Sequence, residues 1–314
     1  MRRAAPPQML RIDPTDPGPW AEVTRSSRGL GLAPTAAPSG DVRPDEHTLR
    51  PTRGTAHAVH RAAVVNGGAV LVTAAPGVAR TFRLPDLTEL FDRRPPGLCD
   101  VRGATGANAA LLRDDTGWRA VVLPSMGDLA SDLGPGPIAI RGDGRRLAVV
   151  HEGALFEVEI PGSSTQQVET AASPGPVAFA SDGSVVVAYG AGLGEPRDGS
   201  PVVGLVPAGD APRARTRHED GTLRLWDTAT GSEGGQWNTT LDHVGSVALR
   251  ASGSRAALCG TDGATPVAHV VDAATGVVIR SIRGAAAVAF GSGDGLVVGG
   301  DWGLILLEPS REEI

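Results

Sequence analysis

The chain repeats a short pattern: an apolar segment, a tight polar turn and a second apolar segment. Four of the first segments align with their turns without gaps, at residues 138–144, 177–183, 247–253 and 288–294. The second apolar runs begin at Leu147, Val185, Ala256 and Leu296. A strand, a tight turn and a second strand form a β-hairpin. Recurring hairpins predict a fold in which one small β-unit is used several times.

A second landmark recurs in the later half of the chain. Trp-Asp-Thr-Ala-Thr-Gly at 226–231 matches Val-Asp-Ala-Ala-Thr-Gly at 271–276, and each is typical of a third strand with its exit turn. A unit of four strands in roughly 40 residues is the period of β-propeller blades. The 43 glycines and 25 prolines, with 20% charged residues, also favour short strands separated by turns. We therefore predict an all-β propeller of four-stranded blades.

The number of blades depends on the segment between residues 177 and 247. First strands are expected near residues 58, 101, 138 and 177, and the next clear one begins at Val247. Residues 202–206 supply an additional first strand, because their distance to Trp226 equals that from Val247 to Val271. This interpretation predicts seven blades, one of them short. The alternative is six blades with an insertion at residues 191–217; we prefer seven.

The two ends of the repeat region predict how the ring closes. Residues 50–54 resemble residues 280–284, and both segments precede a first strand, so each is expected to be an outermost strand. The propeller is predicted to span residues 47–314, with a strand at about 47–53 completing the last blade. Closure of this kind removes an exposed sheet edge. Residues 1–46, which contain eight prolines, are predicted to form an irregular N-terminal arm.

The stretch from His218 to Gly231 resembles the signature of the WD-repeat family. In that family a buried hydrogen-bond set links a His, a Ser or Thr, an Asp and a Trp within a blade. Asp220 and Trp226 match this pattern in one blade, and His243 and Asp262 match it in the next, where Val271 replaces the Trp. The resemblance implies a propeller in which Trp226 is buried, with Asp220 as a candidate partner for its indole nitrogen.

The overall charge restricts the partners that we expect. The formal net charge is −6 and the isoelectric point is about 5.7, whereas nucleic-acid and anionic-membrane binders need a basic surface. No signal peptide or membrane span is evident, so we expect a cytoplasmic protein. No catalytic motif and no metal-ligand spacing are evident, so we expect neither enzymatic activity nor a cofactor.

The turns between second and third strands carry acidic residues and share one face of the predicted propeller. If they ring the mouth of the channel, they form a surface for a basic peptide or a cation; the alternative is that Asp-Gly pairs are simply what tight turns use. The candidate contact residues in these turns are Asp114, Asp115, His151, Glu152, Asp262, Asp301 and Trp302.

Three arginines alternate with other residues at Arg213, Arg215 and Arg217. In a strand they share one face. They are interpreted either as a solvated edge or as a docking site for an acidic partner.

These observations favour a non-catalytic module that binds a protein or peptide partner through the loops at the ends of its blades. Two other functions stay open. One is a propeller-type hydrolase or lactonase with carboxylates or a metal ion at the central channel, and the other is a sensor domain that acts beside a separate signalling or effector protein. The fold supports many functions, so the site must decide between them.

Overall fold

The computed structural model describes residues 49–309, except residues 56–57, 105, 161–163, 171, 209 and 292–294. These residues form a β-propeller of seven antiparallel sheets, and the only helical element among them is one 3₁₀ turn, η1 (Asn66–Gly68). The prediction of an all-β propeller with seven blades is confirmed. The predicted N-terminal arm at residues 1–46 lies outside the described residues.

Blades are numbered here in chain order, and in blades 1 to 6 the strands follow one another outward from the central channel. Blade 1 consists of β2 (Arg61–Val65), β3 (Val70–Ala75), β4 (Val78–Arg83) and β5 (Thr88–Arg93). Blade 2 consists of β6 (Asp100–Gly103), β7 (Ala109–Asp114), β8 (Gly117–Val122) and β9 (Gly127–Ala130). Blade 3 consists of β10 (Ile138–Ile140), β11 (Arg146–His151), β12 (Ala154–Glu159) and β13 (Thr165–Val168).

The second half of the ring continues in the same order. Blade 4 consists of β14 (Val177–Phe179), β15 (Val185–Tyr189) and β16 (Gly192–Leu193). Blade 5 consists of β17 (Val202–Pro207), β18 (Arg213–His218), β19 (Thr222–Asp227) and β20 (Glu233–Asn238). Blade 6 consists of β21 (His243–Leu249), β22 (Arg255–Asp262), β23 (Thr265–Asp272) and β24 (Val278–Arg283). Blade 7 consists of β25 (Ala287–Phe290), β26 (Leu296–Gly300), β27 (Gly303–Pro309) and β1 (Leu49–Thr55).

Blade 4 differs from its neighbours because it has three strands. Its last strand, β16, is only two residues long, and the chain then passes to β17, the first strand of blade 5. The region 191–217, considered as an insertion in the six-blade alternative, therefore contains β16, β17 and most of β18. Only 25 residues separate the starts of β14 and β17, and this length leaves no room for a fourth strand.

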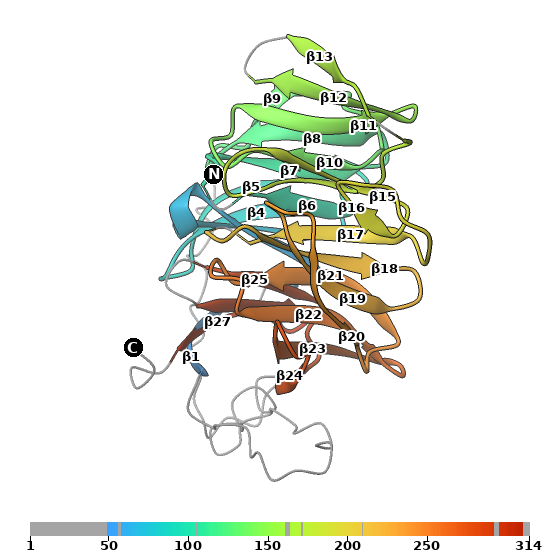
Figure 1. The fold of residues 1–314 in the computed structure, drawn as a ribbon. Coiled ribbons are helices and arrows are strands. Elements are labelled where there is room, and N and C mark those ends of the chain that lie inside the picture. Colours follow the sequence, from blue (N-terminus) through green and yellow to red (C-terminus); the bar gives the residue numbers. More distant parts are fainter. Residues whose placement is uncertain are drawn as a thin grey trace.

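Blade 7 joins the two ends of the described chain. Strand β1 pairs antiparallel with β27, from Leu49 opposite Pro309 to Thr55 opposite Leu304, and β27 continues to β26 and β25. Figure 1 shows the blue β1 beside the red β27. The fourth strand of the last blade thus comes from the beginning of the described chain, and these backbone hydrogen bonds hold the ring closed.

The aligned hairpins share one turn geometry. In three of them a glycine occupies the left-handed region, with φ of +70° at Gly144, +83° at Gly183 and +71° at Gly253. Its amide donates to the carbonyl three residues earlier in each case, at 2.8 to 2.9 Å. Glycine adopts this conformation without steric cost, which explains why the pattern recurs at these positions.

The hydrophobic core lies between the blades. Seven buried apolar clusters occur, one at each interface between neighbouring sheets, including the interface between blades 7 and 1. The second strands are the most buried; all six residues of β3 are buried, for example, whereas all six residues of β5 are half-buried or exposed. Burial on both faces explains why second strands such as β3 and β26 are continuous apolar runs instead of alternating patterns.

Candidate functional site

A central channel of about 1690 Å³ runs through the propeller, lined by the first strands of all seven blades. We define the entry mouth as the end at which the first strands begin, and the exit mouth as the opposite end. Because neighbouring strands are antiparallel, turns between second and third strands lie on the entry face. Turns between first and second strands lie at the exit mouth. Much of the wall consists of small residues, chiefly Ala, Gly, Val and Pro.

Among the described residues, the entry mouth carries several guanidinium groups and one carboxylate. Arg61 begins β2, and its Nη1 donates to the carbonyl oxygen of His60 at 2.8 Å. Arg102 donates through Nη1 to the carbonyl oxygen of Ile138 at 3.3 Å and lies over the Trp118 ring, 4.7 Å from its centre. The Asp100 carboxylate lies between the two arginines, 3.7 Å from Nε of Arg61 and 3.5 Å from Nε of Arg102. Both contacts are longer than hydrogen bonds, so they are loose ion pairs.

Arg217 reaches the same channel from the second strand of blade 5. Its Nε lies 3.4 Å from the position that a Cβ on Gly204 would occupy, so the guanidinium group extends over the side-chain-free surface of the first strand. Burial, and to a smaller extent the charge of Arg61, lower the pKa of Arg217. It forms no hydrogen bond or ion pair with the residues that the structure describes. Arg217 is therefore a half-buried cation without a carboxylate partner in that part of the chain.

The exit mouth has different charges. Asp143, Asp182 and Asp210 line this end of the channel. Asp143 pairs with Arg141 in its own turn, and Asp182 accepts hydrogen bonds from the backbone amide and hydroxyl of Ser184. Hydrogen bonds from Ser184 lower the pKa of Asp182. Two of these carboxylates therefore serve the local turns, as expected for Asp in tight turns.

The acidic turns do share the entry face, but they do not line the channel. They join second strands to third strands, which lie farther out in each blade, and none of their acidic residues contributes to the channel wall. The prediction that acidic groups ring the mouth is therefore wrong. Instead, exposed carboxylates form an outer ring around a basic mouth. The exposed members of this ring are Asp115, Glu152, Glu219, Asp220, Asp262 and Asp301.

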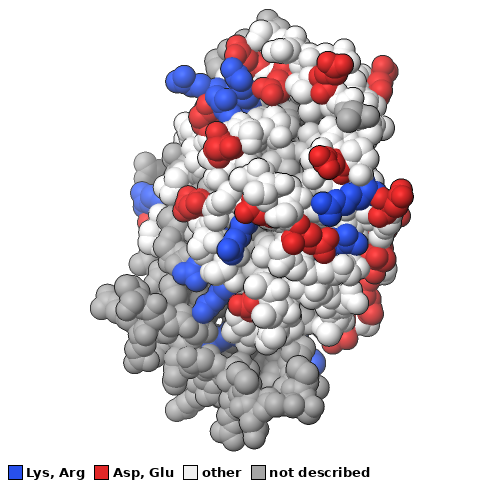
Figure 2. Space-filling model, in the orientation of Figure 1, with Lys and Arg blue, Asp and Glu red and all other residues white. Residues whose placement is uncertain are grey.

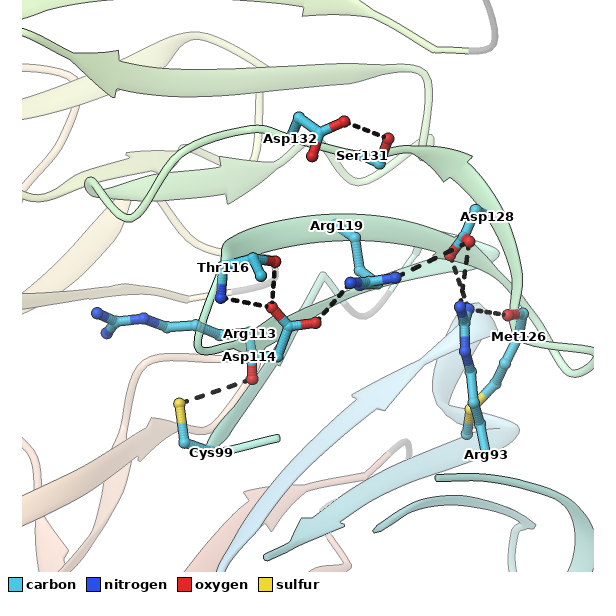
Figure 3. Close-up of polar contacts among 10 residues, drawn as sticks. All are labelled: Arg93, Cys99, Arg113, Asp114, Thr116, Arg119, Met126, Asp128, Ser131 and Asp132. Atoms are coloured by element: carbon cyan, nitrogen blue, oxygen red, sulfur yellow. Dashed lines mark hydrogen bonds and ion pairs between the residues drawn. The ribbon is translucent and has the colours of Figure 1, made fainter. Parts of the chain in front are cut away.

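Asp114 has a structural position and is buried, so the expectation that it contacts a partner does not hold. Its Oδ1 accepts from the Thr116 hydroxyl at 2.6 Å, and its Oδ2 accepts from Arg119 at 2.5 Å (Figure 3). These hydrogen bonds hold the pKa of the Asp114 carboxyl below its usual range. Arg119 also lies 4.0 Å from Asp128, which accepts two hydrogen bonds from Arg93 of blade 1. The charges therefore alternate from blade 2 to blade 1 and connect the two sheets.

The remaining predicted contacts on the entry face differ in accessibility. His151 and Glu152 are exposed and lie 3.8 Å apart, and Asp301 is 88% exposed while bonded to His60 at 2.8 Å. Trp302 is half-buried against the cluster between blades 6 and 7. Its indole nitrogen donates to the carbonyl oxygen of Gly284 at 2.8 Å. Trp302 therefore fixes the end of its blade and offers a partner only part of its ring.

The row of three arginines is not a solvated edge. Their strand, β18, lies between β17 and β19, and Arg215 is 1% exposed. The Arg215 guanidinium stacks 4.8 Å from the centre of the Trp237 ring and donates to the carbonyl oxygen of Ala273 in the neighbouring blade. Burial lowers the pKa of Arg215 to about 10. Arg213 is exposed, so the three side chains have three different environments.

Blade 5 contains a buried hydrogen-bond chain that sequence reasoning missed. The Trp226 indole nitrogen donates to the Thr216 hydroxyl oxygen at 2.8 Å, and Thr216 lies 2.9 Å from Nε2 of His218. Nδ1 of His218 lies 2.7 Å from the carbonyl oxygen of Ser200 and must donate to it, so Nε2 accepts from Thr216. Asp220, the expected partner of Trp226, accepts instead from the amide of Thr222. The alternation of Thr216 and His218 on one strand face was the available signal.

Comparison with known proteins adds no family assignment, because no protein-family model and no curated protein matches this chain. Among the described residues, no group of three or more His, Cys, Asp or Glu side chains is arranged to hold a metal ion. The same part of the chain contains no helix that is long and apolar enough to cross a membrane. The face presented in Figure 2 shows acidic and basic side chains interspersed with uncharged surface.

Proposed function

We propose that this propeller is a binding module of the WD-repeat type, without chemistry of its own, and that its entry face binds a basic protein segment. The observation that carries the proposal is the outer ring of exposed carboxylates, contributed by five separate blades. Glu152 and Asp262 represent it well, because both residues are exposed and lie in turns between second and third strands, after β11 and at the end of β22.

The geometry suits recognition of an extended or irregular partner. Seven packed sheets supply a rigid platform, and the turns supply the specificity, as binding loops do on other scaffolds. Carboxylates spread around a ring attract Lys and Arg side chains and raise the rate of encounter with a basic partner. We expect no binding to nucleic acid, because a polyanionic strand lying across this face would be repelled by the carboxylates of the outer ring.

A peptide-display selection tests this proposal. We expect peptides rich in Lys and Arg to be enriched on the immobilised protein, with binding that weakens as salt concentration rises. The double substitution Glu152→Lys and Asp262→Lys is expected to lower the affinity of a selected peptide at least tenfold, measured by fluorescence anisotropy.

The matched control makes the same charge change at the exit mouth. Asp182→Lys with Asp210→Lys alters the net charge equally, and circular dichroism checks that each variant is folded. The proposal is contradicted if the two double variants lose affinity equally, or if the exit-mouth variant alone loses it.

A further inference from the structure

The basic entry mouth is not explained by the proposed contact with a basic segment. Arg61, Arg102 and Arg217 all line the channel, with side-chain exposures of 37% for Arg61 and 48% for Arg102. A basic partner would be repelled by these groups at the centre of the face. The mouth therefore needs an explanation of its own.

The charges at the mouth are incompletely neutralised within the described residues. Asp100 is the one channel-lining carboxylate at this end, and it is shared by Arg61 and Arg102 at distances beyond hydrogen bonding. Arg113 also lines the mouth; its guanidinium lies 5.8 Å from the centre of the Trp118 ring, and Figure 3 shows its side chain extending away from Asp114. Several guanidinium groups and one carboxylate therefore line this end of the channel. Arg217 has no acidic partner among the described residues.

The arginines are also held in place, which distinguishes them from mobile surface charges. Arg61 and Arg102 each use Nη1 to donate to a backbone carbonyl, and Trp118 supports the flat face of Arg102. Arg217 extends over Gly204, where no side chain competes for space. Each guanidinium has five N–H donors in a planar fork, and such forks bind planar or tetrahedral oxyanions through two donors at once.

We propose that the entry mouth of the channel is an anion-binding site, at which Arg61, Arg102 and Arg217 bind a carboxylate or phosphate group. Asp100 limits the affinity by its own charge and orients the two arginines beside it. The surrounding carboxylate ring then binds basic groups around a centre that binds an acidic one. The anion site does not depend on the proposed binding of a basic segment.

Isothermal titration calorimetry at low ionic strength and pH 7.5 tests the site, with inorganic phosphate and succinate as the two probes. We expect Arg217→Gln to weaken binding roughly tenfold, the loss typical of one charge-assisted hydrogen bond. Asp100→Asn is expected to strengthen binding severalfold, because it removes the competing negative charge. Tighter binding of phosphate than of succinate assigns a phosphate-bearing ligand, and the reverse order assigns a carboxylate.

Two controls separate this result from general charge effects. Arg145→Gln removes an exposed arginine from the turn at the exit mouth and is expected to leave both affinities unchanged. Glu152→Lys with Asp262→Lys is expected to retain phosphate or succinate binding even where peptide binding is lost. Arg61→Gln replaces Arg217→Gln if the latter fails to fold. The proposal is overturned if neither anion binds at millimolar concentration, if the Arg217 and Arg145 variants behave alike, or if Asp100→Asn weakens binding.

Discussion

Blades 5 and 6 share their strand order, a bulge and an exit turn, but they have different interiors. Their third strands end at Asp227 and Asp272 in equivalent turns, and their first two strands carry a bulge at the same place, between Val202 and Gly204 and between Val244 and Ser246. In blade 5 the interior is a polar chain, whereas in blade 6 every corresponding position is apolar or side-chain-free.

The register identifies the corresponding residues. Ala214 lies opposite Trp226 in blade 5, and Ala256 lies opposite Val271 in blade 6. Counting along the second strands, Leu258 corresponds to Thr216 and Gly260 to His218. A Cβ on Gly260 would lie 1.9 Å from the carbonyl oxygen of His243, so the backbone of blade 6 fills space that a side chain occupies in blade 5. The repeat therefore specifies strands and turns, while each interior is completed in its own way.

The largest loss of stability is expected when the central side chain of each blade, Trp226 or Val271, is replaced by alanine. Trp226→Ala is expected to lower the unfolding free energy by about 3–5 kcal/mol, because it leaves a large cavity and removes the N–H group that donates to the Thr216 hydroxyl oxygen. Val271→Ala removes two carbons and should cost roughly 2 kcal/mol. Urea unfolding followed by circular dichroism measures both. Equal losses of unfolding free energy in the two variants would show that Trp226 and its hydrogen-bond chain stabilise blade 5 no more than Val271 stabilises blade 6.

The same comparison shows what the sequence can and cannot predict about the fold. The Gly turns are local, so hairpins such as the one at Asp182 and Gly183 could be recognised from a few residues. The blade count depended on equal spacing to Trp226 and Val271, and this reasoning identified β17 correctly. The number of residues between β14 and β17 predicted that blade 4 is short. Strand β16 itself could not be predicted, because it has only two residues and no recognisable sequence pattern.

The site was harder to predict because it depends on distance from the channel axis. The sequence placed the acidic turns on one face, yet it does not show that those turns lie outside the channel wall. Asp114 and Asp115 look equivalent in the sequence, but one is buried by Thr116 and Arg119 and the other is exposed. The arginines of the mouth come from blades 1, 2 and 5, and no local spacing connects them.

A second substitution, at Thr216, removes the hydrogen bonds and leaves the packing of the Trp226 side chain in place. Thr216→Val keeps the shape but removes the acceptor of the Trp226 N–H and the donor to His218. We expect a loss of about 1–3 kcal/mol, the cost of leaving buried polar groups without partners. Thr81→Val in blade 1 is the matched control, because Thr81 is equally buried but its hydroxyl makes only contacts of 3.5 Å. Comparable losses of unfolding free energy in the two variants would contradict a specific stabilising role for the hydrogen-bond chain of blade 5.

The smallest expected effect is a dependence on pH. Burial lowers the pKa of His218 below the ordinary histidine value of 6.5, and also that of His269 in blade 6. Since the unfolded chain binds the proton more readily, the contribution of each histidine to stability is fully present above pH 6.5. It is lost as the pH drops toward the lower folded pKa, by at most about 1.4 kcal/mol per pH unit for each group.

The two blades should respond to acid for different reasons. Protonation of His218 at Nε2 removes the acceptor of the Thr216 hydroxyl, so acid breaks the polar chain of blade 5 as well as charging a buried ring. For His269 the cost is the charging of a buried ring. His218→Gln and His269→Gln should each reduce the slope of unfolding free energy between pH 6.5 and 5, with the larger reduction in the blade 5 variant. Unchanged slopes in both variants would mean that other groups set the acid sensitivity. A larger reduction of the slope for His269→Gln would mean that the hydrogen-bond chain adds nothing to the cost of protonating His218.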